Sequence, residues 1–195
     1  MLEEEYQRRR VPPAHLRKRP EPEPSFSFTV REAAEQDLPD VREIYNHYVA
    51  NSTVTFDETP WTPRTLRTKF ARVRELGYPF LVAASPSGVV LGFAYVYPWK
   101  EKAAYRFTVE NSIYLGPAST GKKLGTALMG ELLERARAAG VKEVIAVIAD
   151  RGAEGSIALH ERFGFETTGS MGRVGFKFGR WLGVVMMQKS LTRRR

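Results

Sequence analysis

The chain has 195 residues, of which 43% are hydrophobic and 27% charged, a composition typical of one globular domain with a sizeable core. It contains no cysteine, which excludes disulfides, cysteine-ligated metals and thiol nucleophiles and fits a reducing compartment such as the cytoplasm. No apolar run approaches the roughly 20 residues that a membrane-spanning helix requires, and the acidic run 3–5 is unlike a secretory or mitochondrial leader. We therefore expect a cytoplasmic protein without a membrane partner.

The net charge of +8 is spread unevenly along the chain. Residues 1–24 hold six basic and five acidic side chains together with five prolines, and the chain ends in the three arginines 193–195. We expect 1–24 to be a flexible charged arm, with a partner-binding segment as the alternative, and 193–195 to be a basic tail. The intervening domain, 25–192, then carries a charge of +4, which suits a small polyanionic ligand better than nucleic acid.

Local patterns predict the elements of the first half of the domain. Alternating apolar and polar residues in 25–32 predict a strand, and Thr62 followed by Pro63 is a favourable pair for the start of a helix. The turn residues of Ser85–Gly88 join two apolar segments as a hairpin. The predicted order is strand, helix, short extended segment, helix and two hairpin strands, at 25–32, 38–50, 53–56, 62–76, 78–84 and 89–97.

The second half begins with the segment TVENSIYL, 108–115, whose apolar residues fall on one face of a strand. The nearly continuous apolar segment EVIAVIA, 143–149, predicts a central strand that is buried on both faces. A helix is predicted at 156–163, and two strands at 166–173 and 184–190 close the domain. Together these elements predict a single mixed α/β sheet with helices on both faces.

The segment ASTGKKLGTALMGELLERARAA, 118–139, combines a glycine-containing turn with a helix that has an apolar stripe. Since a strand precedes it, the arrangement presents free backbone N–H groups and the positive end of a helix dipole to an anion. Gly121 and Gly125 allow a phosphate to approach the backbone, and Lys122 and Lys123 add positive charge. The alternative is an ordinary strand-to-helix turn with a solvated basic tip.

Metal chemistry and serine-hydrolase chemistry find no support in the sequence. No cluster of His, Asp and Glu has the spacing of metal ligands, and Ser112 and Ser156 lack the partners of a catalytic triad. We therefore expect neither a metal cofactor nor a hydrolase.

Four segments carry a resemblance to a known family: IYNHYVANSTVTF (44–56), GFAYVYPWKEKAAYRFTVENSIYL (92–115), SIALHERFGF (156–165) and VGFKFGRW (174–181). In this order they resemble the GNAT superfamily of acetyl-CoA-dependent N-acetyltransferases, and within it the phosphinothricin N-acetyltransferase group. The resemblance implies the GNAT fold, a mostly antiparallel sheet splayed at the cofactor cleft. It also implies an N-acetyltransferase for the amino group of a small amino acid or analogue, acting as a homodimer by direct transfer in a ternary complex.

The resemblance assigns catalytic roles to two residues. Glu110 matches the family's general base, which takes a proton from the acceptor amine, and its alternative is a surface carboxylate at the end of a strand. His160 stands where many members have a tyrosine that protonates the coenzyme A sulfur, and an imidazole can do so near neutral pH. The alternatives for His160 are a substrate contact and a structural histidine at the sheet edge.

The resemblance also implies two sets of binding residues. The first set supplies backbone groups to the acetyl-CoA thioester and pantetheine arm or forms the phosphate turn: Ile113, Tyr114, Leu115, Gly121, Lys122, Lys123, Leu124, Gly125, Thr126 and Ser156. The second set supplies cations and aromatic walls to the acceptor, although each member taken singly also fits a place in the core or on the surface: Phe56, Trp99, Lys100, Tyr105, Arg106, Lys177 and Trp181.

The phosphate turn departs from the family pattern, because Thr120 and Lys123 replace its first Arg or Gln and its middle glycine. The segment DRGAEG, 150–155, also lacks the asparagine that relatives place near Ala153. These departures support a second hypothesis, a GNAT-fold protein with weakened or lost coenzyme A binding that serves as a non-catalytic module. A third hypothesis is acetylation of RNA or protein, guided by the basic tails.

Overall fold

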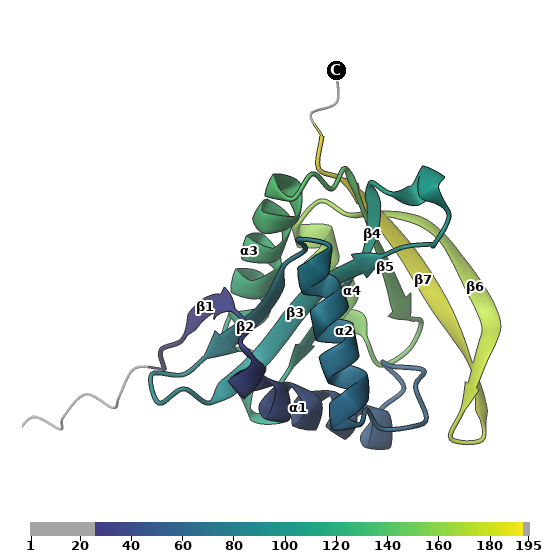
Figure 1. Cartoon of the computed structure of the whole chain (residues 1–195). Helices are drawn as coiled ribbons and strands as arrows, with labels where there is room; N and C mark the ends of the chain where they lie inside the picture. The colour runs from purple at the N-terminus through teal and green to yellow at the C-terminus, as the bar shows by residue number, and fades with distance from the viewer. Residues whose placement is uncertain (1–25, 193–195) are drawn as a thin grey trace, which may run out of the picture.

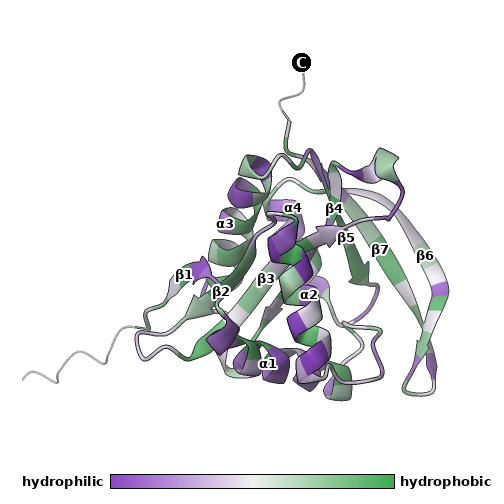
Figure 2. Cartoon of the chain, viewed as in Figure 1, coloured by the Kyte–Doolittle hydropathy of each residue, from purple (hydrophilic) through white to green (hydrophobic). Residues whose placement is uncertain are grey.

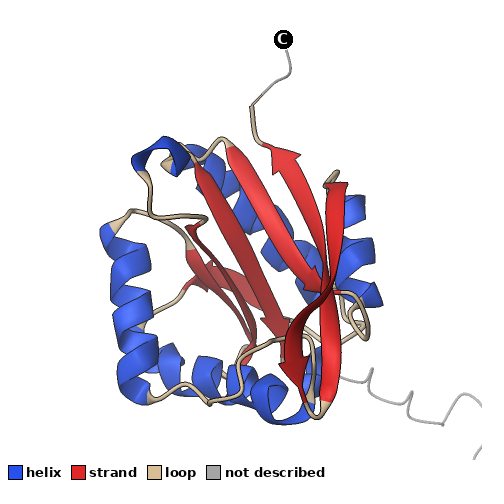
Figure 3. Ribbon diagram, turned by 90° about the vertical axis from the view of Figure 1, so that its right-hand side faces the viewer, coloured by secondary structure: helices blue, strands red, loops and turns tan. Residues whose placement is uncertain are grey.

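The computed structural model describes residues 26–192, so the arm expected at 1–24 and the basic tail expected at 193–195 lie outside the described residues. Seven strands form one sheet with helices on both sides (Figures 1 and 3). The strands are β1 (Thr29–Glu32), β2 (Phe80–Ala84), β3 (Val90–Pro98), β4 (Thr108–Leu115), β5 (Glu143–Ala149), β6 (Glu166–Lys177) and β7 (Arg180–Ser190). The helices are α1 (Leu38–Asn51), α2 (Pro63–Glu75), α3 (Leu124–Ala138) and α4 (Glu154–Arg162), with 3-10 turns η3 (Glu35–Asp37), η4 (Ala103–Tyr105) and η5 (Pro117–Ser119).

The strand order across the sheet is β1-β2-β3-β4-β5-β7-β6. Every neighbouring pair is antiparallel except β4 and β5, which are parallel. The prediction of a single mixed, mostly antiparallel sheet with helices on both faces is therefore confirmed. No helix within residues 26–192 combines the length and the apolar character that crossing a membrane requires.

Each face of the sheet packs against its own pair of helices. Leu66, Phe70 and Val73 recur at helical spacing on α2 and are buried with α1 against one face. The apolar stripe of α3, with partly buried residues of α4, packs against the other face. Figure 2 accordingly shows apolar colouring along the inner strands and mixed colouring on α1 and α2. Because side chains alternate along a strand, neighbouring residues of β4 belong to opposite faces.

The structure differs from the predicted elements in two places. The segment 53–56, expected to be short and extended, is an irregular loop whose threonines, Thr53 and Thr55, are buried. The last two strands are longer than predicted, because the register shift between Met171 and Gly175 is a bulge inside β6 and does not end it. The apolar segment 143–149, by contrast, forms β5 with the predicted bounds.

The sheet opens between its two parallel strands. β4 and β5 pair only through Thr108–Glu110 and Glu143–Ile145. Beyond this point β4 continues beside β3, while β5 continues beside β7. The second half of β4 therefore has one edge without a neighbouring strand, and this edge is where the sheet can receive a ligand.

Candidate active site

A cavity of about 680 Å³ occupies the opening between β4 and β5. Nine of the ten residues expected at the cofactor line it, and they come from β4, the start of α3 and α4: Ile113, Tyr114, Leu115, Gly121, Lys123, Leu124, Gly125, Thr126 and Ser156. The tenth, Lys122, is turned elsewhere, because its Nζ donates to the Ala118 carbonyl at 3.1 Å and lies 4.3 Å from the ring centre of Phe26.

The start of α3 contributes backbone amides that no side chain caps. Gly121 and Lys123 have φ angles of 76° and 63°, a left-handed conformation that directs the chain into the helix. Lys123 accepts a helical hydrogen bond from Ala127, so the N–H groups of 124–126 have no acceptor within the helix. Free amides at the positive end of a helix dipole form a site for an anion such as a phosphate.

The open edge of β4 offers a second set of backbone groups. The N–H of Gly116 donates to the carbonyl of Leu91, in β3, and alternation then points the backbone of 111, 113 and 115 toward the open side. The Leu115 carbonyl is already occupied by the Tyr48 hydroxyl at 2.7 Å. Residue 113 keeps its N–H and C=O for an extended ligand, which can pair there as an added strand would.

Glu110 lies where β4 leaves β5, and it lines the cavity. Its carboxylate is half-buried, and this burial raises its pKa above the ordinary value, while the positive charges of Lys100 and Lys69 oppose the rise. Its cross-strand neighbour on β3 is Tyr97. A carboxylate of raised basicity beside a cavity can take a proton from a bound ligand.

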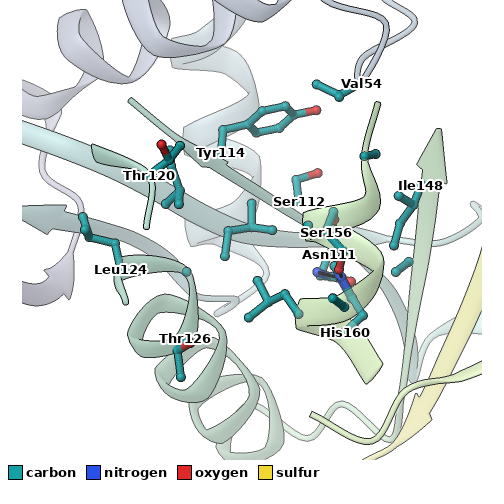
Figure 4. Close-up of a pocket in the computed structure, with 18 of the residues that line it drawn as sticks. Val54, Asn111, Ser112, Tyr114, Thr120, Leu124, Thr126, Ile148, Ser156 and His160 are labelled. Carbon is teal, nitrogen blue, oxygen red and sulfur yellow. Dashed lines mark hydrogen bonds between the residues drawn. The ribbon is translucent and has the colours of Figure 1, made fainter. Parts of the chain in front are cut away.

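His160 is almost fully buried, at 2% exposure, and both of its ring nitrogens have partners (Figure 4). Nδ1 lies 2.7 Å from the Ser156 carbonyl oxygen, so Nδ1 carries the proton and donates it to that oxygen. Nε2 therefore accepts from the Asn111 side-chain amide at 3.0 Å. Burial also lowers the pKa of His160, which keeps the ring neutral. This geometry favours the structural alternative for His160 over proton donation to a ligand.

Asn111 is the other member of this pair and also lines the cavity. It is 7% exposed, and its Oδ1 has no hydrogen-bond partner within the described part of the chain. Since a buried acceptor without a donor costs free energy, Asn111 offers this oxygen to a ligand N–H or to water.

The face of the sheet that carries Glu110 also holds a cluster that the sequence patterns did not indicate. Asp57 accepts hydrogen bonds from the Tyr45 hydroxyl at 2.7 Å and from Trp61 Nε1 at 3.2 Å. The two aromatic rings stack with their centres 3.6 Å apart. Lys69 reaches this cluster from α2, and its half-buried ammonium feels the charges of both Asp57 and Glu110. The cluster places charges of both signs beside the candidate base.

The lysine expected at the acceptor from β6, Lys177, is used inside the protein. It is 2% exposed, and its Nζ donates to the carbonyls of Ser52 and Thr55 at 2.9 and 2.8 Å. It therefore stabilises the loop between α1 and α2, and the expectation that it contacts an acceptor carboxylate is not supported. Phe56 lies in the same loop and is directed at the backbone of Gly175, where an added Cβ would meet its ring.

The remaining acceptor candidates lie on or near the surface. Lys100 places its Nζ 4.5 Å from the ring centre of Trp99, within electrostatic reach of Glu110. Arg106 donates to the Ala103 carbonyl and is exposed. Tyr105 and Trp181 are 41% and 50% exposed, on η4 and β7. Within residues 26–192, no three His, Asp or Glu side chains are arranged to hold a metal ion.

Comparison with known proteins gives consistent matches. The family model for acetyltransferases of the GNAT family matches residues 40–165. The chain is 44% identical over 167 residues to an L-methionine sulfoximine/L-methionine sulfone acetyltransferase of Pseudomonas paraeruginosa, covering 85% of this chain and 96% of the relative. It is 39% identical over 164 residues to a phosphinothricin N-acetyltransferase of Alcaligenes faecalis, covering 84% and 83%.

A solved structure extends the match to three dimensions. The phosphinothricin acetyltransferase of Sinorhizobium meliloti, solved in complex with acetyl-CoA, superposes with a TM-score of 0.80 at 44% identity. The superposition covers 84% of this chain and 88% of that structure.

Proposed function

The chain belongs to the acetyltransferase (GNAT) family, and from this premise we propose that it transfers the acetyl group of acetyl-CoA to the amino group of a small amino-acid analogue. The acceptor class that we propose is the methionine sulfoximine and phosphinothricin type, which is the class named for its relatives. The observation that carries the proposal is a single cavity with uncapped helix amides on one side and Glu110 on the other.

The groups that line the cavity suit acetyl-CoA, which supplies an activated thioester. The free amides of 124–126 suit its diphosphate, and the open edge of β4 at 113 suits its amide-containing arm. Lys123 adopts a left-handed backbone, the conformation that glycine takes most readily, and its side chain is exposed. This conformation supports retained binding of acetyl-CoA and disfavours the alternative of a non-catalytic module.

We assign Glu110 the role of general base. An ammonium group must lose a proton before its nitrogen can attack a thioester, and Glu110 lies at the cavity with a pKa raised by burial. The charges of Lys100 and Lys69 oppose this rise of the pKa and so favour the ionised carboxylate, which is the form that accepts a proton. Acetyl transfer is direct, within a complex that holds both ligands at once.

We assign His160 a positioning role. Its only N–H is used by the Ser156 carbonyl, and its Nε2 accepts from Asn111. The imidazole thus fixes the Asn111 amide so that Oδ1 is left for a ligand at the cavity. To donate a proton to the coenzyme A sulfur, as a tyrosine would, His160 would need a proton on Nε2. The contacts instead favour a proton on Nδ1 alone.

We also propose where the acceptor enters and how the chain assembles. Trp99, Lys100 and Tyr105 form the rim of the acceptor site, on the loop before β4 and beside Glu110. A homodimer forms through the β6–β7 hairpin, which extends away from the helices (Figure 1). This hairpin exposes five large apolar side chains by about half: Met171, Val174, Phe176, Phe178 and Trp181. The protein acts in the cytoplasm on small molecules, and no nucleic acid takes part.

A panel assay of thiol release from acetyl-CoA tests the proposed function. L-Methionine sulfoximine, L-phosphinothricin and the common amino acids are offered in parallel, with acetyl-CoA alone as the blank. We expect acceptor-dependent release that is fastest with the sulfoximine or phosphinothricin. Absence of release with every acceptor, together with absence of acetyl-CoA binding, would instead establish the non-catalytic module.

A further inference from the structure

We propose that Lys69 binds the carboxylate of the amino-acid acceptor and so selects α-amino acids over simple amines. The inference rests on the proposed acetyltransferase function and deepens it. Lys69 lies on α2, outside every segment for which the family resemblance implied a role.

Three aromatic rings surround the Lys69 ammonium. Nζ lies 5.6 Å from the ring centre of Trp61, 5.5 Å from that of Tyr95 and 4.5 Å from that of Tyr97. Ring faces attract a cation, so this arrangement fixes the ammonium in place beside the sheet. The side chain therefore loses little conformational freedom when a ligand binds to it.

The three N–H donors of this ammonium have no acceptor among the described residues. No hydrogen bond or ion pair of Lys69 exists in that part of the chain, because the rings offer only their faces. The nearby carboxylate of Asp57 already accepts from Tyr45 and Trp61. Burial lowers the pKa of Lys69, so a bound anion would stabilise its charged form.

The charges around Lys69 match those of an amino acid. Lys69 lies over the ring of Tyr97, and Tyr97 is the cross-strand neighbour of Glu110. The Lys69 ammonium is therefore close enough to Glu110, and also to Asp57, for their charges to interact. An α-amino acid carries its ammonium and its carboxylate on the same carbon atom. When the ammonium approaches Glu110, the carboxylate is therefore brought toward the neighbouring cation.

The other cations near the cleft are less suited to this role. The Lys177 ammonium already donates hydrogen bonds to the Ser52 and Thr55 carbonyls. Arg106 and Lys100 are exposed, so water competes with any carboxylate that they bind. Lys69 alone among these four is both half-buried and without an acceptor.

The test compares two acceptors in two variants. The acceptors are L-methionine sulfoximine and 3-aminopropyl methyl sulfoximine, the same molecule without its carboxylate. The variants are Lys69→Met and the matched control Arg67→Met, an exposed residue of the same helix. Loss of a charged hydrogen bond predicts that Lys69→Met lowers the preference for the amino acid, measured as its kcat/KM divided by that of the simple amine, about 10- to 100-fold, while Arg67→Met leaves this ratio unchanged. Any effect of Lys69 on the ionisation of Glu110 acts on both acceptors and cancels in the ratio. Lys69→Arg is expected to keep most of the preference.

Each outcome decides the matter. An equal loss with both acceptors would show that Lys69 acts only through Glu110 and would overturn the inference. Wild-type kinetics in Lys69→Met would overturn it as well. If the wild-type protein acetylates neither acceptor, the proposed function fails, and the inference that rests on it fails with it. Thermal melting of every variant identifies any loss of activity that comes from unfolding.

Discussion

The two sides of the cleft are built by different means. The cofactor side, which comprises the amides of 124–126 and the open edge of β4, is made of backbone groups. The acceptor side that we propose, which comprises Glu110, Asp57, Lys69 and their aromatic neighbours, is made of side chains. Backbone groups persist whatever the side chain, so we expect the cofactor side to tolerate Lys123 where the family has glycine. We therefore expect substrate choice to depend on the acceptor side.

The largest expected effect on activity comes from replacing Glu110, whose carboxylate lies between the cofactor side and the acceptor side. Glu110→Gln keeps the size and polarity of the side chain but cannot take a proton from the acceptor. We expect kcat/KM to fall about 10²- to 10⁴-fold, the usual contribution of a general base. The measurement is thiol release, with thermal melting as the control for folding. Wild-type turnover in this variant across the pH range would contradict the assignment.

A second prediction concerns the hydrogen bond between His160 and Asn111, two side chains beside the cofactor side. His160→Phe keeps the edge-on ring contact with Phe165 but leaves the Asn111 amide buried without its acceptor. We expect a loss of about 2 kcal/mol in the free energy of unfolding, because a buried polar group loses its partner. Urea denaturation measures this loss.

The matched control for this variant is His47→Phe, on the exposed surface of α1, for which we expect little change in stability. Replacing both members of the pair, with His160→Phe and Asn111→Leu, should recover part of the loss, since no buried amide then lacks a partner. A double variant less stable than His160→Phe alone would contradict this account of the pair.

The dependence of activity on pH should report the protonation of Glu110 on the acceptor side. Glu110 acts only when ionised, and burial raises its pKa above the ordinary value of 4.5. The rate kcat/KM should therefore fall as the pH is lowered through a value above 4.5. Lys100→Met removes a positive charge that opposes the rise, so it should move this acid limb to higher pH. A limb that moves equally in the exposed control Lys102→Met would contradict the specific role of Lys100.

The smallest effect is expected on the cofactor side. Lys123→Gly removes a side chain from a left-handed position, and glycine also adds freedom to the unfolded chain. Relief of the left-handed strain stabilises the folded chain by more than the added freedom of the unfolded chain costs. We therefore expect the free energy of unfolding to rise by about 0.5–1 kcal/mol. Acetyl-CoA affinity should change less than about threefold, because the diphosphate contacts are backbone amides. A tenfold or greater loss, measured by calorimetry, would show that the lysine side chain holds the diphosphate.

The same division explains what the sequence could predict. The strand, turn and helix of 108–138 are contiguous, so their pattern predicts a free helix end beside a strand without any knowledge of the tertiary structure. Glu110 followed from a family resemblance carried by the same strand. The apolar run of β5 likewise predicts a buried strand. In β6, by contrast, the glycines suggested that the strand ends at 173, whereas the structure has a bulge there and the strand continues.

The acceptor side could not be predicted in this way, because its residues are distant in the sequence. Lys69 lies on a helix with many basic residues, and nothing local distinguishes it from a solvated lysine. Lys177 shows the opposite case, since it was expected at a ligand but donates to a carbonyl 122 residues away, that of Thr55. In both cases the tertiary contacts, and not the local pattern, decide what surrounds the ammonium group.

The central claim is that a backbone-made site for acetyl-CoA stands beside a carboxylate that does not take part in binding it. Calorimetric titration of acetyl-CoA into the wild-type protein and into Glu110→Gln tests this claim most directly. We predict one site per chain with micromolar affinity in both proteins, equal within about twofold. Absence of detectable binding to the wild-type protein, or loss of binding in the variant, would contradict the claim.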